Sequence, residues 1–249
     1  MSRKTVRAIR AMKGKGIVSL TAYTAPVARM VDDACDFVLV GDSLGQVLYD
    51  YPSTIHVDLD MMIRHGDVVA RTCRQACVVV DMPFGYQESP EVAFRMAARL
   101  MRETACDAIK LEGGVEMADT IRLLVRSGLP VLAHIGLMPQ HAAQTGYRKV
   151  TSEQGEQVLA DARAVAGAGA FAVVLECVDP DLSRRVTAEI DIPTIGIGSG
   201  SDCDGQILVT EDLLGLTGSP PSFAKPLTDL VTPSRKAIAT YAERTRNGR

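Results

Sequence analysis

Seven short runs of consecutive apolar residues, rich in Val, Ile and Leu, recur along the chain. Consecutive apolar residues indicate burial on both faces of a strand, as in a parallel sheet covered by helices, whereas alternation would indicate one solvated face. The runs therefore predict a buried parallel sheet. They are Ile17–Ala22, Asp36–Gly41, Cys77–Met82, Asp107–Glu112, Pro130–Ile135, Phe171–Cys177 and Thr194–Gly198.

Longer segments with helical periodicity lie between these runs, for example Ser89–Thr104, Met117–Ser127 and Ser152–Gly167. With an eighth strand expected at Gln206–Val209, the alternation within 249 residues favours an α/β fold of the (β/α)8 TIM barrel type over a doubly wound sheet. No linker, repeat or low-complexity tract divides the chain. We therefore expect a single barrel domain over residues 1–249, with a C-terminal helical tail near Thr232–Arg246.

Composition and charge exclude several classes of protein. Apolar residues make up 47% of the chain and charged residues 23%, which excludes a disordered chain. The net charge of −3 and the absence of Trp argue against nucleic-acid binding. No apolar stretch approaches ~18 residues and the N-terminus lacks the apolar region of a secretory signal, so we expect a cytoplasmic protein without membrane contact. The six scattered cysteines fit reduced, buried thiols rather than disulfides or a zinc site.

Five consecutive predicted strands carry an ionisable side chain at or near their C-terminal ends. A barrel brings these ends together at one mouth, where the active sites of barrel enzymes lie. We therefore interpret the side chains as parts of one site. They are Asp42, Asp81, Lys110 together with Glu112, His134, and Glu176.

Each of these residues also has a purely structural interpretation. The two aspartates could cap a following segment or form a turn. Lys110 and Glu112, two positions apart on one strand, could form a salt bridge inside the barrel. His134 could be a hydrogen-bonded core histidine. Glu176 fits a structural role least, because a buried carboxylate without a partner is unfavourable.

The chemistry of this residue set points to a divalent cation and a base. Asp42, Asp81 and Glu112 would form an oxygen-rich site, and Mg2+ prefers oxygen ligands from protein, water and substrate. Lys110 would neutralise an anionic substrate. Glu176, with a pKa raised by apolar surroundings, would act as a general base. A divalent ion next to a base can stabilise the oxyanion that forms when the base removes a proton beside a carbonyl.

A glycine-rich run, Gly196-Ile197-Gly198-Ser199-Gly200, is too incomplete for a dinucleotide-binding fingerprint, because position 201 is Ser201. It predicts either a tight loop or a close approach of the backbone to a ligand at the barrel mouth.

Sequence blocks spread in order over about residues 3–230 resemble the ketopantoate hydroxymethyltransferase family. LVGDSLG at Leu39–Gly45 and IKLEGG at Ile109–Gly114 are highly specific at this spacing. Further matching blocks are IVSLTAY at Ile17–Tyr23, VLY at Val47–Tyr49, Ser53–Thr54, LDMMI at Leu59–Ile63, VDMPF at Val80–Phe84, HIGLMPQ at His134–Gln140, LECV at Leu175–Val178, IGIG at Ile195–Gly198 and DGQIL at Asp204–Leu208.

The resemblance implies a (β/α)8 barrel of the phosphoenolpyruvate mutase/isocitrate lyase type. It implies transfer of a hydroxymethyl group from the co-substrate 5,10-methylenetetrahydrofolate to the keto acid 3-methyl-2-oxobutanoate (α-ketoisovalerate), giving 2-dehydropantoate (ketopantoate) in pantothenate biosynthesis. It also implies a homo-oligomer, commonly a decamer. The residue roles that it implies are Mg2+ ligands at Asp42, Asp81 and Glu112, keto-acid contacts at Asp42, Ser43, Asp81 and Lys110, and a proton acceptor at Glu176; His134 is a further candidate.

The chain departs from the family pattern at several positions near the predicted mouth. Gln46 stands where Met is usual, Ala133 and Ser199 where Gly and Ala are usual, and Thr24 where Asp is commoner. The block usually read GGYKVQGR runs here from Thr145 through Tyr147 to Val150, without the QGR ending. None of these changes removes a predicted metal ligand or the predicted base.

Three alternatives remain open at this point. A paralogue with shifted keto-acid specificity would keep the metal site and the base. A metal-dependent carbon–carbon or carbon–phosphorus lyase on the same barrel would need no folate and would carry a catalytic cysteine in a loop, for which Cys203 is the only candidate. A non-catalytic barrel acting as a binding or assembly protein would have lost a ligand or the base, and this sequence retains both.

Overall fold

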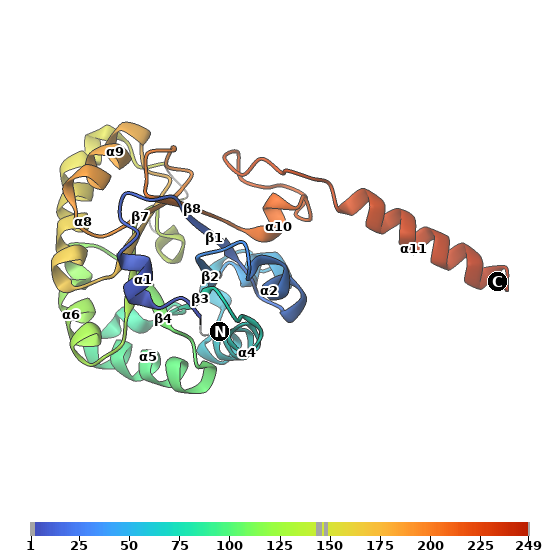
Figure 1. Ribbon diagram of the computed structural model, residues 1–249, viewed down its shortest axis with the longest axis horizontal. Coiled ribbons are helices and arrows are strands. Elements are labelled where there is room, and N and C mark those ends of the chain that lie inside the picture. Colours follow the sequence, from blue (N-terminus) through green and yellow to red (C-terminus); the bar gives the residue numbers. More distant parts are fainter. Residues whose placement is uncertain (1–2, 143–145, 147–148, 249) are drawn as a thin grey trace. The chain divides into compact units, whose positions relative to one another are not determined.

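Eight parallel strands form a closed barrel in the computed structural model, which describes residues 3–142, 146 and 149–248. The strands follow one another around the barrel in chain order, and Figure 1 labels β1 to β4, β7 and β8. All eight predicted strands are confirmed, and no end differs from its predicted position by more than one residue. The strands are β1 (Ile17–Thr21), β2 (Phe37–Val40), β3 (Cys77–Asp81), β4 (Ala108–Glu112), β5 (Val131–Gly136), β6 (Ala172–Glu176), β7 (Thr194–Ile197) and β8 (Gly205–Leu208).

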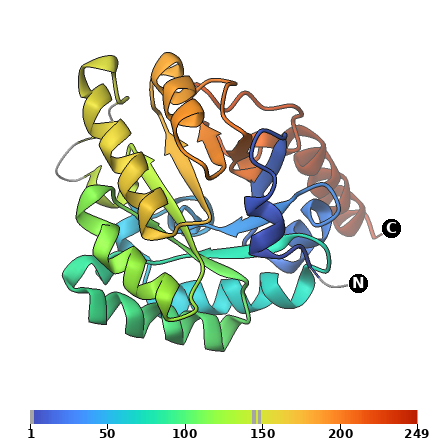
Figure 2. The same ribbon diagram turned by 60° about the vertical axis from the view of Figure 1, so that its left-hand side comes forward.

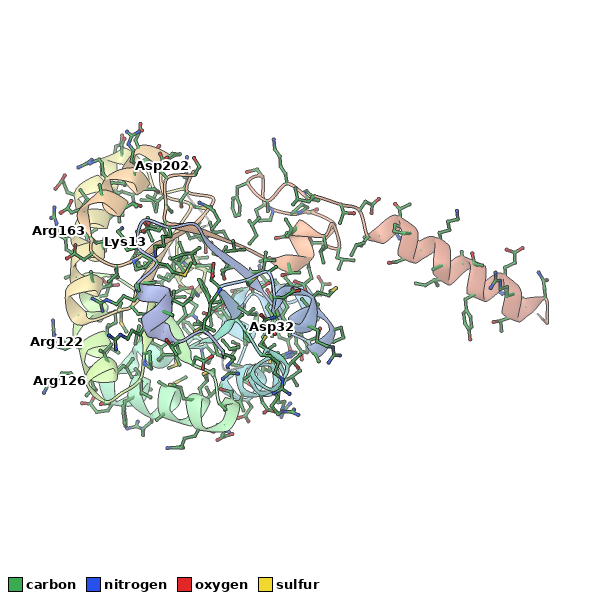
Figure 3. The ribbon with its side chains drawn as sticks, viewed as in Figure 1. Lys13, Asp32, Arg122, Arg126, Arg163 and Asp202 are labelled. Atoms are coloured by element: carbon green, nitrogen blue, oxygen red, sulfur yellow. The ribbon has the colours of Figure 1, made fainter. Side chains whose placement is uncertain are left out.

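Helices surround the strands, and the two views in Figure 1 and Figure 2 agree on this arrangement. The predicted helical segments appear as α5, α6 and α8, and Ser89 caps α5 by accepting a hydrogen bond from Val92 N, with Pro90 in the first turn. Charged side chains such as Arg122 and Arg163 project outward from α6 and α8 (Figure 3). The helices up to β8 are α1 (Val6–Arg10), α2 (Ala25–Val31), α3 (Leu44–Tyr49), α4 (Leu59–Thr72), α5 (Pro90–Thr104), α6 (Ala118–Arg126), α8 (Gly155–Ala168) and α9 (Pro180–Glu189).

The apolar side chains of the strands divide into two cores because neighbouring residues point to opposite faces. On β2, Val38 and Val40 pack outward against the helices, whereas Phe37 and Leu39 fill the barrel interior. Ile9 of α1 belongs to the interior cluster as well. On β4 the alternation places Ala108 inside and Ile109 outside, so Lys110 and Glu112 point into the barrel toward its mouth.

Three aspartates form a repeated contact at the N-terminal ends of the strands. Each precedes a strand and accepts a hydrogen bond from a backbone N–H on the strand before it: Asp36 from Val18, Asp107 from Val78 and Asp204 from Thr194, at 2.8–2.9 Å. Each also pairs with a cation near the N-terminus of the chain. The three pairs are Lys4–Asp36, Arg3–Asp107 and Lys13–Asp204. This end of the barrel is therefore tied together by structural ion pairs.

The chain divides into two compact units, residues up to Ile207 and residues from Leu208 onward. The second unit contains α10 (Thr210–Leu213) and α11 (Val231–Arg246), and its loop returns so that Leu227 N and Leu230 N donate to the carbonyls of Leu213 and Leu214. The predicted C-terminal helix is thus present, while the single-domain organisation stays a prediction. No described helix is long and apolar enough to cross a membrane.

Candidate active site

Lys110 and Asp81 form the central ion pair of the barrel mouth. They face each other in the parallel register of β3 and β4, and Lys110 Nζ lies 2.7 Å from Asp81 Oδ1. Both side chains are buried, with exposed fractions of 7% and 4%. Burial alone would lower the pKa of Lys110, but Asp81, Asp42 and Glu112 raise it above its usual value. The lysine therefore stays charged, and its ion-pair partner is Asp81 rather than Glu112, the partner considered from the sequence.

Asp42 follows β2 and lies directly beside Asp81. Its backbone N–H donates to Asp81 Oδ2 at 3.0 Å. Burial and the neighbouring charge of Asp81 raise the pKa of Asp42 to about 6. A Cβ at Gly41 would lie 2.8 Å from Ser43 Oγ, so a side chain before Asp42 would displace the Ser43 hydroxyl. Ser43 itself is half-buried, and its hydroxyl lies 2.7 Å from Tyr23 OH.

Glu112 ends β4 and is fixed by two groups that the sequence did not single out. Tyr86 OH donates to Glu112 O at 2.7 Å and accepts from Glu112 N at 2.6 Å. Glu112 Oε2 accepts from the backbone N–H of Gln140 at 3.2 Å. Burial and the charge of Asp42 raise the pKa of Glu112 well above its usual value. The carboxylate is thus held at the mouth near another carboxylate that it repels.

His134 and Glu176 lie on the next two strands. His134 Nε2 lies 2.8 Å from Leu137 O and 3.5 Å from Glu176 Oε2. Burial and the charge of Lys110 lower the pKa of His134 well below its usual value, so we assign the neutral ring with Nε2–H donating to Leu137 O. His134 Nδ1 is buried and has no hydrogen-bond partner among the described residues.

Glu176 keeps an uncharged carboxyl more readily than an ordinary glutamate. Its side chain is 18% exposed. Burial raises its pKa to about 8, an effect that Lys110 opposes and that Asp42 and Asp81 reinforce. This shift is in the direction expected for a general base that works near neutral pH.

Gln140 and Gln87 are further site residues that the sequence did not indicate. Gln140 Nε2 donates to Asp42 Oδ2 and to Met82 O, both at 2.9 Å, and Gln140 Oε1 accepts from Gln87 Nε2 at 3.0 Å. The only sequence signal for Gln140 was its position at the end of the HIGLMPQ block. A glutamine side chain does not by itself indicate a catalytic or metal-binding role, so neither Gln140 nor Gln87 was assigned one.

The donor set at the mouth fits a hard divalent cation. Asp42, Asp81 and Glu112 offer only oxygen, and burial together with a neighbouring carboxylate raises the pKa of Asp42 and of Glu112, so a bound cation would favour their ionised forms. Within the described residues, no three His, Cys, Asp or Glu side chains are arranged so that together they could hold a metal ion. The three predicted ligands are thus not arranged to bind one ion together. Mg2+ is commonly bound through only one or two carboxylates and completed by water or substrate oxygens, which Asp42 and Asp81 would suit.

The glycine-rich run forms a tight loop. Gly198 and Gly200 have positive φ angles of 64° and 80°. Ser199 is buried, and its hydroxyl donates to Leu175 O at 2.7 Å and accepts from Val178 N at 3.0 Å. This family departure thus secures the backbone on both sides of Glu176.

Other residues set apart by the sequence lie away from the ion pair. Gln46 is exposed on α3, Thr24 precedes α2, and Ala133 is buried on β5. Thr145 and Tyr147 of the altered block lie outside the described residues. Cys203 is partly buried, and burial raises the pKa of its thiol, which disfavours the thiolate that a reactive cysteine requires.

A barrel that gathers a buried lysine and ionisable carboxyls at the C-terminal ends of its strands has the arrangement of a barrel enzyme's active site. Comparison with known sequences narrows this class. The sequence model of the family described as ketopantoate hydroxymethyltransferase matches residues 3–249. The chain belongs to this family.

Individual relatives agree over nearly the whole chain. This chain is 55% identical over 244 residues to the 3-methyl-2-oxobutanoate hydroxymethyltransferase of Paracoccus denitrificans. The aligned region covers 96% of this chain and 88% of the relative. The chain is also 55% identical over 251 residues to the protein of the same name from Rhizobium etli, with 98% and 92% covered. The chain is therefore a hydroxymethyltransferase, which disfavours the lyase and the non-catalytic barrel.

Solved structures with low sequence identity share the fold. The phosphoenolpyruvate phosphomutase of Streptomyces platensis subsp. rosaceus has a TM-score of 0.67 at 14% identity, covering 98% of this chain and 88% of that one. A 2,3-dimethylmalate lyase, a member of the phosphoenolpyruvate mutase/isocitrate lyase superfamily, has a TM-score of 0.62 at 17% identity, covering 100% and 90%. The predicted barrel type is confirmed.

Proposed function

We propose that this chain transfers a hydroxymethyl group from 5,10-methylenetetrahydrofolate to 3-methyl-2-oxobutanoate, giving 2-dehydropantoate in pantothenate biosynthesis. The observation that carries the proposal is the single buried group formed by strand-end side chains: Lys110 bonded to Asp81, Asp42 beside it, and Glu176 with a raised pKa across the mouth. A keto acid needs a cationic partner for its carboxylate and a base for the proton beside its carbonyl. This group offers both.

We propose Mg2+ as the metal, held by Asp42 and Asp81 with Glu112 nearby. Such an ion supplies Lewis-acid stabilisation of the negative charge that develops on a keto oxygen during proton removal. The excess of buried carboxylates over cations supports this assignment.

The side chains of the mouth divide the remaining work. Lys110 and Ser43 bind the keto acid, Lys110 by its positive charge and Ser43 through a hydroxyl that Tyr23 orients. Glu176 accepts the proton from C3 of the keto acid, and C3 then forms a bond to the methylene carbon of the folate. The two bonds from that carbon to the folate nitrogens break, water supplies the hydroxyl group of the product, and tetrahydrofolate leaves with one proton from water and the one that Glu176 took from C3. Holding both reactants at one mouth removes much of the entropic barrier to their meeting.

His134 lies against Glu176, with its Nε2 3.5 Å from Glu176 Oε2, but it donates its N–H to Leu137 O, so the ring confines the carboxyl group by contact rather than by a hydrogen bond. Its ring is neutral, so it does not compete with Lys110 for the anionic substrate. We therefore assign His134 to positioning rather than to proton transfer.

We further propose a homo-oligomer, a decamer by analogy with the family, in which residues 1–249 act as one barrel domain with a helical tail. Sedimentation velocity of the purified chain tests this assembly. All six cysteines are free thiols, which supports a reducing compartment such as the cytoplasm.

The direct test is an assay of the purified protein for 2-dehydropantoate, with and without methylenetetrahydrofolate and Mg2+. The proposal expects product only when both are present. Product with another keto acid but not with 3-methyl-2-oxobutanoate would favour the paralogue with shifted specificity. Cleavage of a keto-acid substrate without folate would favour a lyase and contradict the proposal.

A further inference from the structure

Gln140 contacts two of the three carboxylates assigned to the metal. Its side-chain Nε2 donates to Asp42 Oδ2 at 2.9 Å, and its backbone N–H donates to Glu112 Oε2 at 3.2 Å. The residue is 4% exposed and follows Pro139 in the short 3-10 turn after β5. Gln140, in the turn after β5, therefore connects the C-terminal ends of β2 and β4.

The orientation of the Gln140 amide is fixed by a chain of hydrogen bonds that begins at a backbone donor. Gly85 N donates to Gln87 Oε1 at 3.1 Å, which leaves Gln87 Nε2 to donate to Gln140 Oε1 at 3.0 Å. Gln140 Nε2 then faces two acceptors, Asp42 Oδ2 and Met82 O. Both amides have only one orientation that satisfies every partner, because the chain starts at an N–H and ends at a carbonyl and a carboxylate.

This arrangement counteracts a repulsion. Asp42 and Glu112 are both buried and both contact Gln140, and like charges in a low dielectric push apart. The two N–H donors of Gln140 attract both carboxylates toward one residue. Loss of the amide would remove the hydrogen bond that fixes Asp42 Oδ2.

We propose that Gln140 is a positioning residue that holds Asp42 and the neighbouring Glu112 in place at the site where Asp42 and Asp81 would receive a divalent cation. Gln87 acts through Gln140 by orienting its amide. The inference rests on the metal assignment made under the proposed function, and Gln140 itself touches neither substrate nor metal in this account.

The experiment measures Mn2+ binding to the purified, substrate-free protein by electron paramagnetic resonance of the free ion. Gln140→Leu removes the amide and keeps a side chain of similar size. We expect its Kd for Mn2+ to rise about 10–100-fold, the usual effect of losing a hydrogen-bond partner of a metal ligand. Gln87→Leu leaves every contact to Asp42 in place but frees the amide to rotate, so its Kd should rise in the same direction by a smaller factor.

Gln157→Leu is the matched control. Gln157 Nε2 donates to Asp161 Oδ1 at 2.9 Å on the exposed face of α8, where Asp161 Oδ1 also accepts from Val115 N, and the contact involves none of the three carboxylates of the mouth. Its Kd for Mn2+ should equal that of the wild type. Circular dichroism and thermal unfolding of all variants establish that each is folded.

A folded Gln140→Leu protein with the wild-type Kd overturns the inference and leaves the proposed function standing. If Gln140→Leu fails to fold, Gln87→Leu decides, and an unchanged Kd in that variant overturns the inference. A wild-type protein that binds no Mn2+ refutes the metal assignment and the inference together.

Discussion

The surroundings of the barrel mouth favour the charged form of Lys110 but the uncharged form of Glu176. Lys110 remains charged because three carboxylates around it outweigh the effect of burial. Glu176 lies farther from a compensating partner, and burial raises its pKa to about 8. The mouth thus contains a cationic binding group, Lys110 on β4, and a base of moderate strength, Glu176 on β6.

The raised pKa of Glu176 predicts how the rate depends on pH. A general base works only when ionised, so kcat/KM should rise with pH, about tenfold per unit well below pH 8, and level off above it. The measurement is kcat/KM for the keto acid between about pH 6 and pH 9.5 at saturating folate and Mg2+. A flat profile across this range would show that Glu176 is already ionised and that its surroundings do not act as described.

Lys110→Ala should raise the KM for the keto acid by about 10–100-fold, because a charged hydrogen bond is worth about 1.5–3 kcal/mol. The KM for the folate should change much less, since the lysine is assigned to the carboxylate of the keto acid. Steady-state kinetics with each substrate varied in turn separates the two. An unchanged keto-acid KM would mean that Lys110 serves only to neutralise Asp81.

Asp42→Ala should reduce turnover at saturating Mg2+ by more than about 100-fold. Loss of a residue that only hydrogen-bonds to a metal ligand typically costs about 10–100-fold, and Asp42 is proposed as a ligand itself. Asp81→Ala should reduce it too, but it also strands the buried charge of Lys110, so Asp42→Ala is the cleaner variant. Turnover is measured over a range of Mg2+ concentrations, and circular dichroism checks the fold. Wild-type turnover in Asp42→Ala would refute its role as a ligand.

At the scale of elements, the strands could be predicted from the sequence because burial on both faces leaves a run of apolar residues that few other structures produce. The site residues could be predicted as a group for a related reason: each one interrupts such a run at its C-terminal end. Asp42, Asp81, Lys110, Glu112 and Glu176 therefore stood out before any contact was known.

The contacts between these residues could not be predicted in the same way. Lys110 pairs with Asp81 because the register of β3 and β4 sets them opposite each other, and one strand's sequence carries no information on register. Gln140 and Tyr86 were missed because their roles arise only from what lies opposite them in the fold. A polar residue in a loop has many structural explanations until its partners are known.

Asp204 provides a contrast between the two ends of the barrel. It is buried at the N-terminal end, where it accepts from Gly14 N and Thr194 N and pairs with Lys13. Asp204→Ala should lower the free energy of unfolding by about 2–3 kcal/mol, because backbone donors and a charge lose their partner. Urea denaturation measures this, and kcat per folded molecule should stay near the wild-type value. A loss of kcat without a loss of stability would contradict the division between a structural and a functional end.

At the scale of the whole molecule, family membership and the barrel mouth support the same reaction by independent routes. The family rests on sequence identity over nearly the full chain. The mouth rests on contacts among side chains from β2 to β6 and the loops that follow them. Formation of a bond at C3 of the keto acid requires removal of the C3 proton, and Glu176 is the base that we propose for this step.

Exchange of the C3 proton of 3-methyl-2-oxobutanoate for deuterium, measured by NMR in D2O with Mg2+ and without folate, tests that step directly. The wild-type protein should catalyse the exchange, because proton removal precedes the transfer. Glu176→Gln has nearly the same size and should still bind the keto acid, but it should exchange the proton about 10²–10⁴-fold more slowly. Equal exchange rates in the variant and the wild type would contradict the account, since another group would then be the base.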